Sequence, residues 1–129
     1  MVETSTFQVY NASAGSGKTF TLVKEYLKVL LASEDLFLFQ KILAITFTNK
    51  AAAEMKERVM LNLEEFASGE NNALLPVILK EIEIDKSLVK VRSQKILEAI
   101  LQNYSAFSIT TIDSFTHKII KNFAFDLGL

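Results

Sequence analysis

The residues with the most specific chemistry lie near the start of the chain, where positions 12–19 read Ala-Ser-Ala-Gly-Ser-Gly-Lys-Thr. They match the phosphate-binding pattern G-x-x-x-x-G-K-[ST], called Walker A, except that Ala12 replaces the first glycine. Glycines let successive backbone N–H groups surround a phosphate, and a following helix adds its free N-terminal donors. Lys18 would bring a cation to the outer phosphates, and the hydroxyl of Thr19 would bind Mg²⁺. The residues predicted to bind a nucleoside triphosphate are Ala14, Gly15, Ser16, Gly17, Lys18 and Thr19.

A loop of this kind needs a strand before it and a helix after it. Residues 7–10 alternate weakly between apolar and polar side chains, which predicts a short strand. After the loop, apolar residues recur at intervals of three and four, which predicts a helix with one buried face. These residues are Leu22, Val23, Tyr26, Leu27, Leu30 and Leu31. From this loop alone, kinases, GTPases, transporters and motor proteins all stay open as functions.

The next part of the chain predicts a second strand and helix. Residues 42–47 form a short apolar run with β-branched side chains, which is typical of a parallel strand covered on both faces. Thr48 and Asn49 can cap a helix, and Gly69 can end it. The apolar face of this helix would consist of Ala52, Met55, Val59, Leu63 and Phe66. Residues 69–72 predict a surface loop, and Pro76 is expected in the first turn of another helix.

The remaining pattern predicts a further helix, a third strand at residues 107–112 and a last helix at 114–125. The residues that outline the further helix are Val89, Ile96, Leu97, Ile100, Leu101 and Tyr104. Strands alternating with helices predict the α/β class, with a parallel sheet flanked by helices. Ligands of such sheets bind at the carboxyl ends of the strands, where all the motifs discussed here fall.

Composition limits the other possibilities. The chain has 129 residues, half of them apolar, and 14 basic against 15 acidic side chains, so it predicts a folded domain or part of one. It has no cysteine for a disulfide, a thiolate metal site or thiol catalysis. We see no signal peptide and no apolar run long enough to cross a membrane, so we predict a cytoplasmic location. Residues 41–58 carry a net charge of +2, a weak positive patch that a solvated helix explains equally well.

Two further segments resemble known motifs. Residues 42–59 read I-L-A-I-T-F-T-N-K-A-A-A-E-M-K-E-R-V, and they resemble motif Ia of the UvrD/Rep-like superfamily 1 DNA helicases nearly residue for residue. Residues 109–115, I-T-T-I-D-S-F, are similar to the T-[IL]-H-S-F motif of the RecB/AddA helicase-nuclease branch. The Walker A form A-S-A-G-S-G-K-T-F-T-L is also closer to that branch.

This resemblance implies the N-terminal part of a first RecA-like motor domain over residues 1–129, with a helical insertion at about 61–105. The fold would be an incomplete P-loop NTPase sheet, and the nucleotide would be ATP. The implied partner is single-stranded DNA, and a possible second partner is another protein of a helicase-nuclease complex. In the family Phe47 would stack on a base, Thr48 would bind a phosphate and Thr111 would also contact DNA. Taken without the family, the position of Phe47 favours core packing at a strand end.

Asp113 lies within the third motif, and His117 lies just after it. Asp113 stands where the motif has histidine, and we interpret it as a helix N-cap in preference to a metal ligand. This departure leaves open any DNA contact that the histidine makes. His117 is expected at a plain surface position.

Several parts of an ATPase are not found in the sequence. No Asp-Glu pair follows a strand, and in the family the Walker B acid, the water-orienting glutamate, the arginine fingers and the nuclease domain come later. We therefore expect nucleotide binding without turnover and no catalytic residue in this segment. The missing central neighbour of the Walker A strand would leave exposed sheet edges, which predicts self-association. The alternatives are a small complete P-loop nucleotide kinase, which a phosphotransfer assay would reveal, and a binding fragment that uses no nucleotide.

Overall fold

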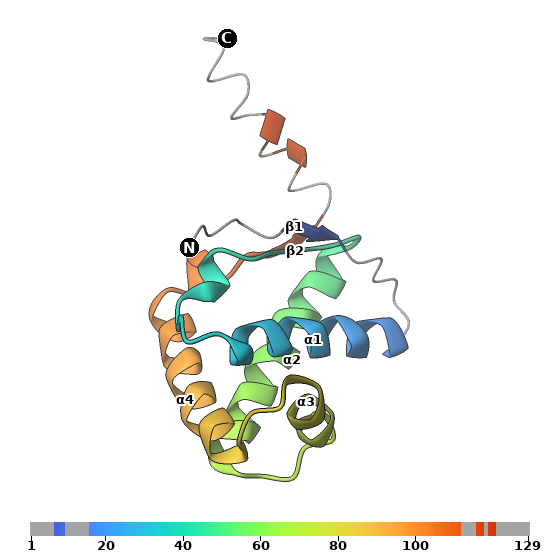
Figure 1. Cartoon of the computed structure of the whole chain (residues 1–129). Helices are drawn as coiled ribbons and strands as arrows, with labels where there is room; N and C mark the ends of the chain where they lie inside the picture. The colour runs from blue at the N-terminus through green and yellow to red at the C-terminus, as the bar shows by residue number, and fades with distance from the viewer. Residues whose placement is uncertain (1–6, 10–15, 112–115, 118, 121–129) are drawn as a thin grey trace.

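The computed structural model describes residues 7–9, 16–111, 116–117 and 119–120. In this part of the chain three short strands form one parallel sheet in the order β1-β2-β3 (Figure 1). Ala44 of β2 is paired with Ile109 of β3, and Thr46 is paired with Thr111. The mixed α/β class with a parallel sheet is therefore confirmed. The strands are β1 (Phe7–Val9), β2 (Leu43–Thr46) and β3 (Ile109–Thr111).

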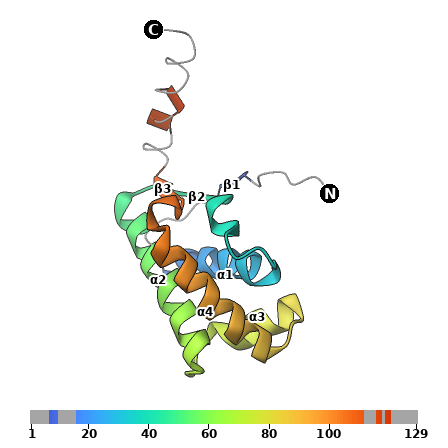
Figure 2. The ribbon, with the colours of Figure 1, turned by 90° about the vertical axis from the view of Figure 1, so that its left-hand side faces the viewer.

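The main helices lie together on one face of this sheet, as two views at right angles show (Figures 1 and 2). The second face has no cover from them, although Ala44, Ile45 and Thr46 are all buried, as expected for this strand. The helices are α1 (Ser16–Ala32), α2 (Asn49–Ser68), α3 (Leu74–Ile82) and α4 (Lys86–Gln102), with short 3-10 helices η1 (Leu38–Gln40) and η2 (Tyr104–Ala106). Within the described residues, no helix is both long and apolar enough to span a membrane.

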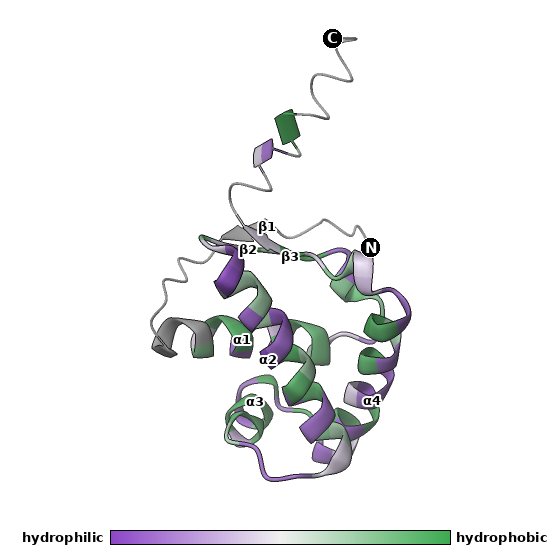
Figure 3. Ribbon diagram, turned by 180° about the vertical axis from the view of Figure 1, so that it is seen from behind, coloured by the Kyte–Doolittle hydropathy of each residue, from purple (hydrophilic) through white to green (hydrophobic). Residues whose placement is uncertain are grey.

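The apolar faces predicted for α1 and α2 are confirmed at every position. All six apolar residues named for α1 and all five named for α2 are buried in the core. Apolar colour follows the inner sides of these helices, while polar residues gather outside (Figure 3). The end of α2 is also as predicted, because Gly69 has φ of 80°, a left-handed conformation that a side chain would strain. Pro76 is the third residue of α3, where it removes no helical hydrogen bond.

The helix predicted from Val89, Ile96, Leu97, Ile100, Leu101 and Tyr104 is confirmed as far as Leu101, and the prediction is wrong at Tyr104. Val89, Ile96 and Ile100 are buried, but Leu101 is 60% exposed and Tyr104 is 46% exposed. The helix ends at Gln102, so Tyr104 belongs to η2 and does not follow the helical spacing. Small residues contribute to the buried face instead, since Ser93 and Ala99 are also buried.

Aromatic rings fill the space between the sheet and α1. Phe39 and Phe107 are buried and pack edge to face, with ring centroids 6.3 Å apart. Tyr26 packs against Phe107 at 6.0 Å, and its burial raises the pKa of its hydroxyl well above the ordinary value. These contacts fix the distance between α1 and the sheet.

Polar contacts hold α1 against the other helices. Arg92 of α4 donates a hydrogen bond from Nη1 to the carbonyl oxygen of Leu31 at 2.7 Å, which satisfies one of the free carbonyls at the C-terminal end of α1. Lys24 and Lys28 of α1 form ion pairs with Glu81 of α3, at 3.3 Å and 2.6 Å. The hydrogen bond to Lys28 lowers the pKa of Glu81. The core packing and these bonds together fix the direction of α1.

The resemblance implied a sheet without the central neighbour of the first strand. Among the described strands, β1 pairs with β2, with Phe7 opposite Leu43, and no strand lies on the other side of β1. The strand order does not contradict that expectation. Backbone groups of an edge strand need partners, and β2 is the nearest parallel strand that offers them.

Candidate nucleotide and DNA site

The ends of the three strands define the candidate site. Because the strands are parallel, Val9, Thr46 and Thr111 end at the same edge of the sheet. The chain continues from β1 into residues 10–15 and α1, and from β2 into Phe47, Thr48 and α2. The predicted motifs therefore meet at the edge where ligands bind in α/β proteins.

The phosphate-binding segment is partly visible. Its residues 12–15, including Ala14 and Gly15, lie outside the described residues. The helical backbone begins at Ser16, so Gly17, Lys18 and Thr19 belong to the first turn of α1. The first backbone N–H groups of a helix have no helical acceptor, and they are available to an anion in front of the helix. The backbone that is described thus fits the strand-to-helix setting that a triphosphate requires.

Thr48 fixes the start of α2. It has an extended backbone, with φ of −128° and ψ of 154°, and its Oγ1 accepts a hydrogen bond from the backbone N–H of Ala51 at 3.0 Å. This is the N-cap predicted from the sequence. A threonine hydroxyl that accepts one hydrogen bond still has its own hydrogen to donate. Thr48 can therefore cap the helix and bind a phosphate oxygen at the same time.

Thr46 holds the loop that follows β2. Its side chain is buried, and Oγ1 lies 3.1 Å from the carbonyl oxygen of Thr48 and 3.2 Å from that of Thr110. The single hydroxyl hydrogen is shared between these two acceptors, one in the loop and one on the neighbouring strand. The sequence analysis assigned no role to Thr46. Its position as a single polar residue at the end of an apolar strand was the one feature that could have indicated this role.

Phe47 lies between these two threonines. Its side chain is 47% exposed, so it is not part of the core. This excludes the core-packing interpretation that its position at a strand end favoured. An exposed aromatic ring at a ligand-binding edge is a suitable surface for a nucleic-acid base.

The third motif is less accessible. Thr111 is 4% exposed and ends β3 on the helix-covered side, so this structure does not present its side chain at the surface. Asp113 lies outside the described residues. His117 is exposed, as expected for a surface position. In the ranges that the structure covers, no cluster of three or more His, Cys, Asp or Glu residues could hold a metal ion.

The positive side chains of α2 have different surroundings. Arg58 lies 3.9 Å from Glu54, a weak ion pair on an exposed face. Lys56 instead turns toward aromatic rings, with Nζ 5.1 Å from the ring centre of Tyr104 and 5.7 Å from that of Phe107. From the sequence Lys56 was expected on a solvated helix face. The contact with Tyr104 could not be predicted, because the two residues lie far apart along the chain.

Comparison with known proteins identifies the family of this chain. A family model described as the UvrD/REP helicase N-terminal domain matches residues 2–129. The chain belongs to this family, so the family predicted from the motifs is confirmed. No solved structure matches the chain significantly.

Curated relatives support the predicted branch as well. The chain is 37% identical over 111 residues to a protein of Clostridium perfringens strain 13 that is named as one subunit of an ATP-dependent helicase/nuclease, covering 86% of this chain and 7% of the relative. Proteins of the same name from Lactobacillus gasseri and Bacillus velezensis are 34% and 31% identical, each over 92% of this chain and 8% of the relative. The chain thus spans less than a tenth of the length of these relatives.

Proposed function

We propose that this chain is the ATP-binding part of an ATP-dependent translocase on single-stranded DNA, in an enzyme of the helicase-nuclease type. The observation that carries this proposal is the position of the first turn of α1 and the exposed Phe47 at one edge of a parallel sheet. The family match over residues 2–129 supports it. In this proposal residues 1–129 form the N-terminal part of a RecA-like P-loop domain, with a helical insertion at about 61–105 that includes α3 and α4.

The nucleotide would bind at the N-terminus of α1. Residues 14–19 would surround its phosphates with backbone N–H groups, Lys18 would balance their charge and Thr19 would bind Mg²⁺. The metal would neutralise charge on the phosphates when bound. Helix α1 is held in place by the core and by Arg92, so the donors of its first turn need no movement of the helix to meet an anion.

The DNA strand would cross the sheet edge beside the nucleotide. Phe47 would stack on a base and Thr48 would donate its hydroxyl hydrogen to a phosphate. Stacking is worth about 1–3 kcal/mol per base and does not depend on base identity, which suits a motor that moves along any sequence. Thr111 is buried in this structure, so it would contact DNA directly only after a movement that exposes its side chain. Since the relatives are named as one subunit of an enzyme, we also propose that a different protein chain is a partner.

Calorimetry with ATP and MgCl₂ tests the nucleotide site. We expect measurable binding by the natural chain and none by Lys18→Ala, with circular dichroism confirming that both are folded. We expect no turnover that depends on Lys18, because arginine fingers alone are worth about 10³–10⁵ in rate and none is identified here. Equal heats for both proteins, or Lys18-dependent turnover at ordinary motor rates, would show that the proposal is wrong.

A further inference from the structure

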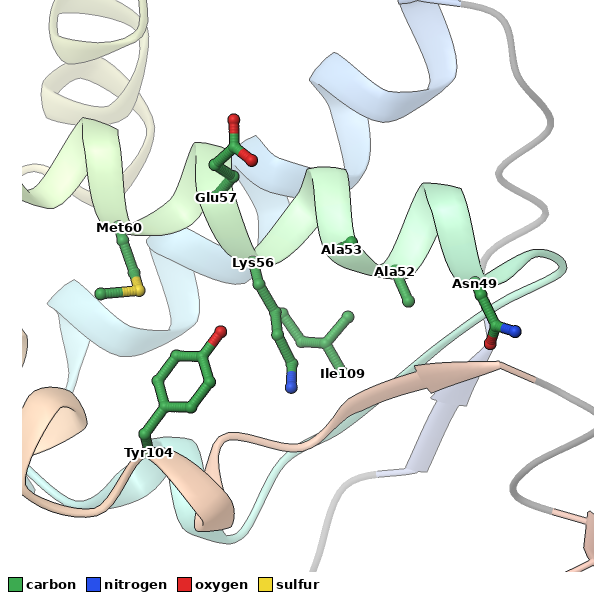
Figure 4. A pocket seen from close by; sticks show the side chains of 8 residues that line it. All are labelled: Asn49, Ala52, Ala53, Lys56, Glu57, Met60, Tyr104 and Ile109. Carbon is green, nitrogen blue, oxygen red and sulfur yellow. The ribbon is translucent and has the colours of Figure 1, made fainter.

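A groove beside the edge strand β3 is not used by the proposed function. It lies between α2 and the segment formed by η2 and β3, and it has a volume of about 610 Å³ (Figure 4). Asn49 lies at the end nearest the strand-end edge, and Met60 and Tyr104 lie at the other end. The floor includes Ile109 of β3. The groove therefore runs from the candidate DNA site along the flank of the sheet.

The groove combines one cation with an accessible aromatic ring. Lys56 reaches into it, and among the described carboxylates none forms an ion pair with its Nζ. The ring of Tyr104 is half exposed and packs edge to face on Phe107 at 6.0 Å, which holds it in place. The Lys56 ammonium lies over the face of this ring. When it moves to a phosphate, the ring provides a stacking surface and the ammonium a phosphate contact.

The position of the groove points to one kind of occupant. Asn49 directly follows Thr48, and Lys56 is seven residues further along α2, about 10 Å at the rise of an α-helix. A single strand that stacks on Phe47 would need to travel only this far to reach Lys56. Glu57 also lines the groove without an ion pair among the described residues, so a longer run of phosphates would be repelled there. The groove offers one ring and one cation, which suits a single nucleotide with one base and one phosphate better than it suits a duplex.

We propose that this groove is a second contact for single-stranded DNA, in which Tyr104 stacks on a base and Lys56 binds the adjacent phosphate. This inference rests on the proposed function, because the same strand would pass over Phe47. It adds a contact on the flank of the sheet to those at the strand ends. Lys56 leaves the faces of the two rings when phosphate is bound, which its flexible stem allows.

Fluorescence anisotropy with a labelled oligothymidylate tests the groove. The variants are Lys56→Gln and Tyr104→Leu, and Lys95→Gln on the exposed side of α4 is the control for loss of one positive charge. We expect Tyr104→Leu to weaken binding by about fivefold or more, the lower end of base stacking. Lys56→Gln should reduce the slope of log affinity against log salt by about 0.7, the value for one phosphate of a single strand. Lys95→Gln should leave this slope unchanged, and circular dichroism checks that each variant is folded.

A crosslinking experiment and a Phe47→Ala variant complete the test. Oligonucleotides containing 5-iododeoxyuridine should crosslink to the peptide that carries Tyr104, as mass spectrometry can show. If Phe47→Ala weakens binding while Lys56→Gln and Tyr104→Leu bind like the natural chain, the groove inference is overturned and the proposed function stands. If the natural chain binds no single-stranded DNA at all, both fail. If the groove variants change self-association in light scattering and leave DNA binding unchanged, the groove is an interface between copies and the inference is overturned.

Discussion

Replacement of Thr48 separates its structural role from its proposed role in DNA binding. The hydroxyl accepts a hydrogen bond of 3.0 Å from the N–H of Ala51, and Thr48 is exposed, so its removal leaves no cavity. Loss of a threonine N-cap typically costs about 1 kcal/mol. For a chain of this size that corresponds to a fall in Tm of about 4 °C. We therefore expect Thr48→Ala to be folded but measurably less stable.

Thr48→Asp is the informative counterpart. Aspartate is at least as good an N-cap as threonine, and its negative charge interacts favourably with the N-terminus of α2. The same charge would repel a phosphate and cannot donate a hydrogen bond to it. We expect Thr48→Asp to keep the Tm of the natural chain and to lose most of its affinity for single-stranded DNA.

Thermal unfolding followed by circular dichroism measures the first effect, and anisotropy with oligothymidylate measures the second. Thr48→Ser serves as the matched control, since it keeps the hydroxyl that both roles require. A Tm for Thr48→Ala equal to that of the natural chain would refute the cap. DNA affinity of Thr48→Asp equal to that of the natural chain would refute the phosphate contact and leave the cap intact.

Three further outcomes follow from the structure. Phe39→Ala should lower the unfolding free energy in urea by about 3 kcal/mol or more, because the ring is fully buried, whereas the half-exposed Phe37→Ala should lower it far less. The pKa of Glu81 is lowered from 4.5, so its ion pairs stabilise the folded state above that pH and this stabilisation is lost as pH falls below it. In Glu81→Gln the free energy of unfolding should therefore fall less on acidification than in the natural chain. The same dependence of unfolding free energy on pH in both proteins would contradict this. Since β1 and β3 each pair with a strand on one side only among the described strands, light scattering should show self-association at high concentration, and a monomer throughout would contradict it.

The sequence was most informative where one physical constraint dominates. The spacing of apolar residues in α1 and α2 predicted every buried position in residues 20–32 and 49–68, because each helix packs one continuous face on a single core. Thr48 and Gly69 were also predicted correctly, since caps depend on neighbouring backbone groups only. The motif at residues 42–59 predicted the family, which the match over residues 2–129 confirms.

Contacts between distant segments could not be predicted in the same way. The hydrogen bond from Arg92 to Leu31 joins positions 61 residues apart, and the approach of Lys56 to Tyr104 depends on how η2 leaves α4. Leu101 is exposed although Ala99 and Ile100 in the same turn of α4 are buried, because it lies on the opposite side of the helix from the core. Local spacing contains no information on where a neighbouring element ends.

The exposure of Phe47 follows from the hydrogen bonds on either side of it. An apolar ring at the end of a buried strand would gain by turning into the core, and at about 25 cal/mol per Å² this gain is considerable. Thr46 opposes that movement because its buried hydroxyl is tied to Thr48 in the loop and to Thr110 on β3. Thr48 in turn is fixed by the first turn of α2. The two threonines therefore set the backbone of Phe47 so that its ring faces outward, at the edge where α1 also begins. A ring held in this way would meet a base without first leaving the core, and this is the physical basis of the DNA contact proposed for this edge.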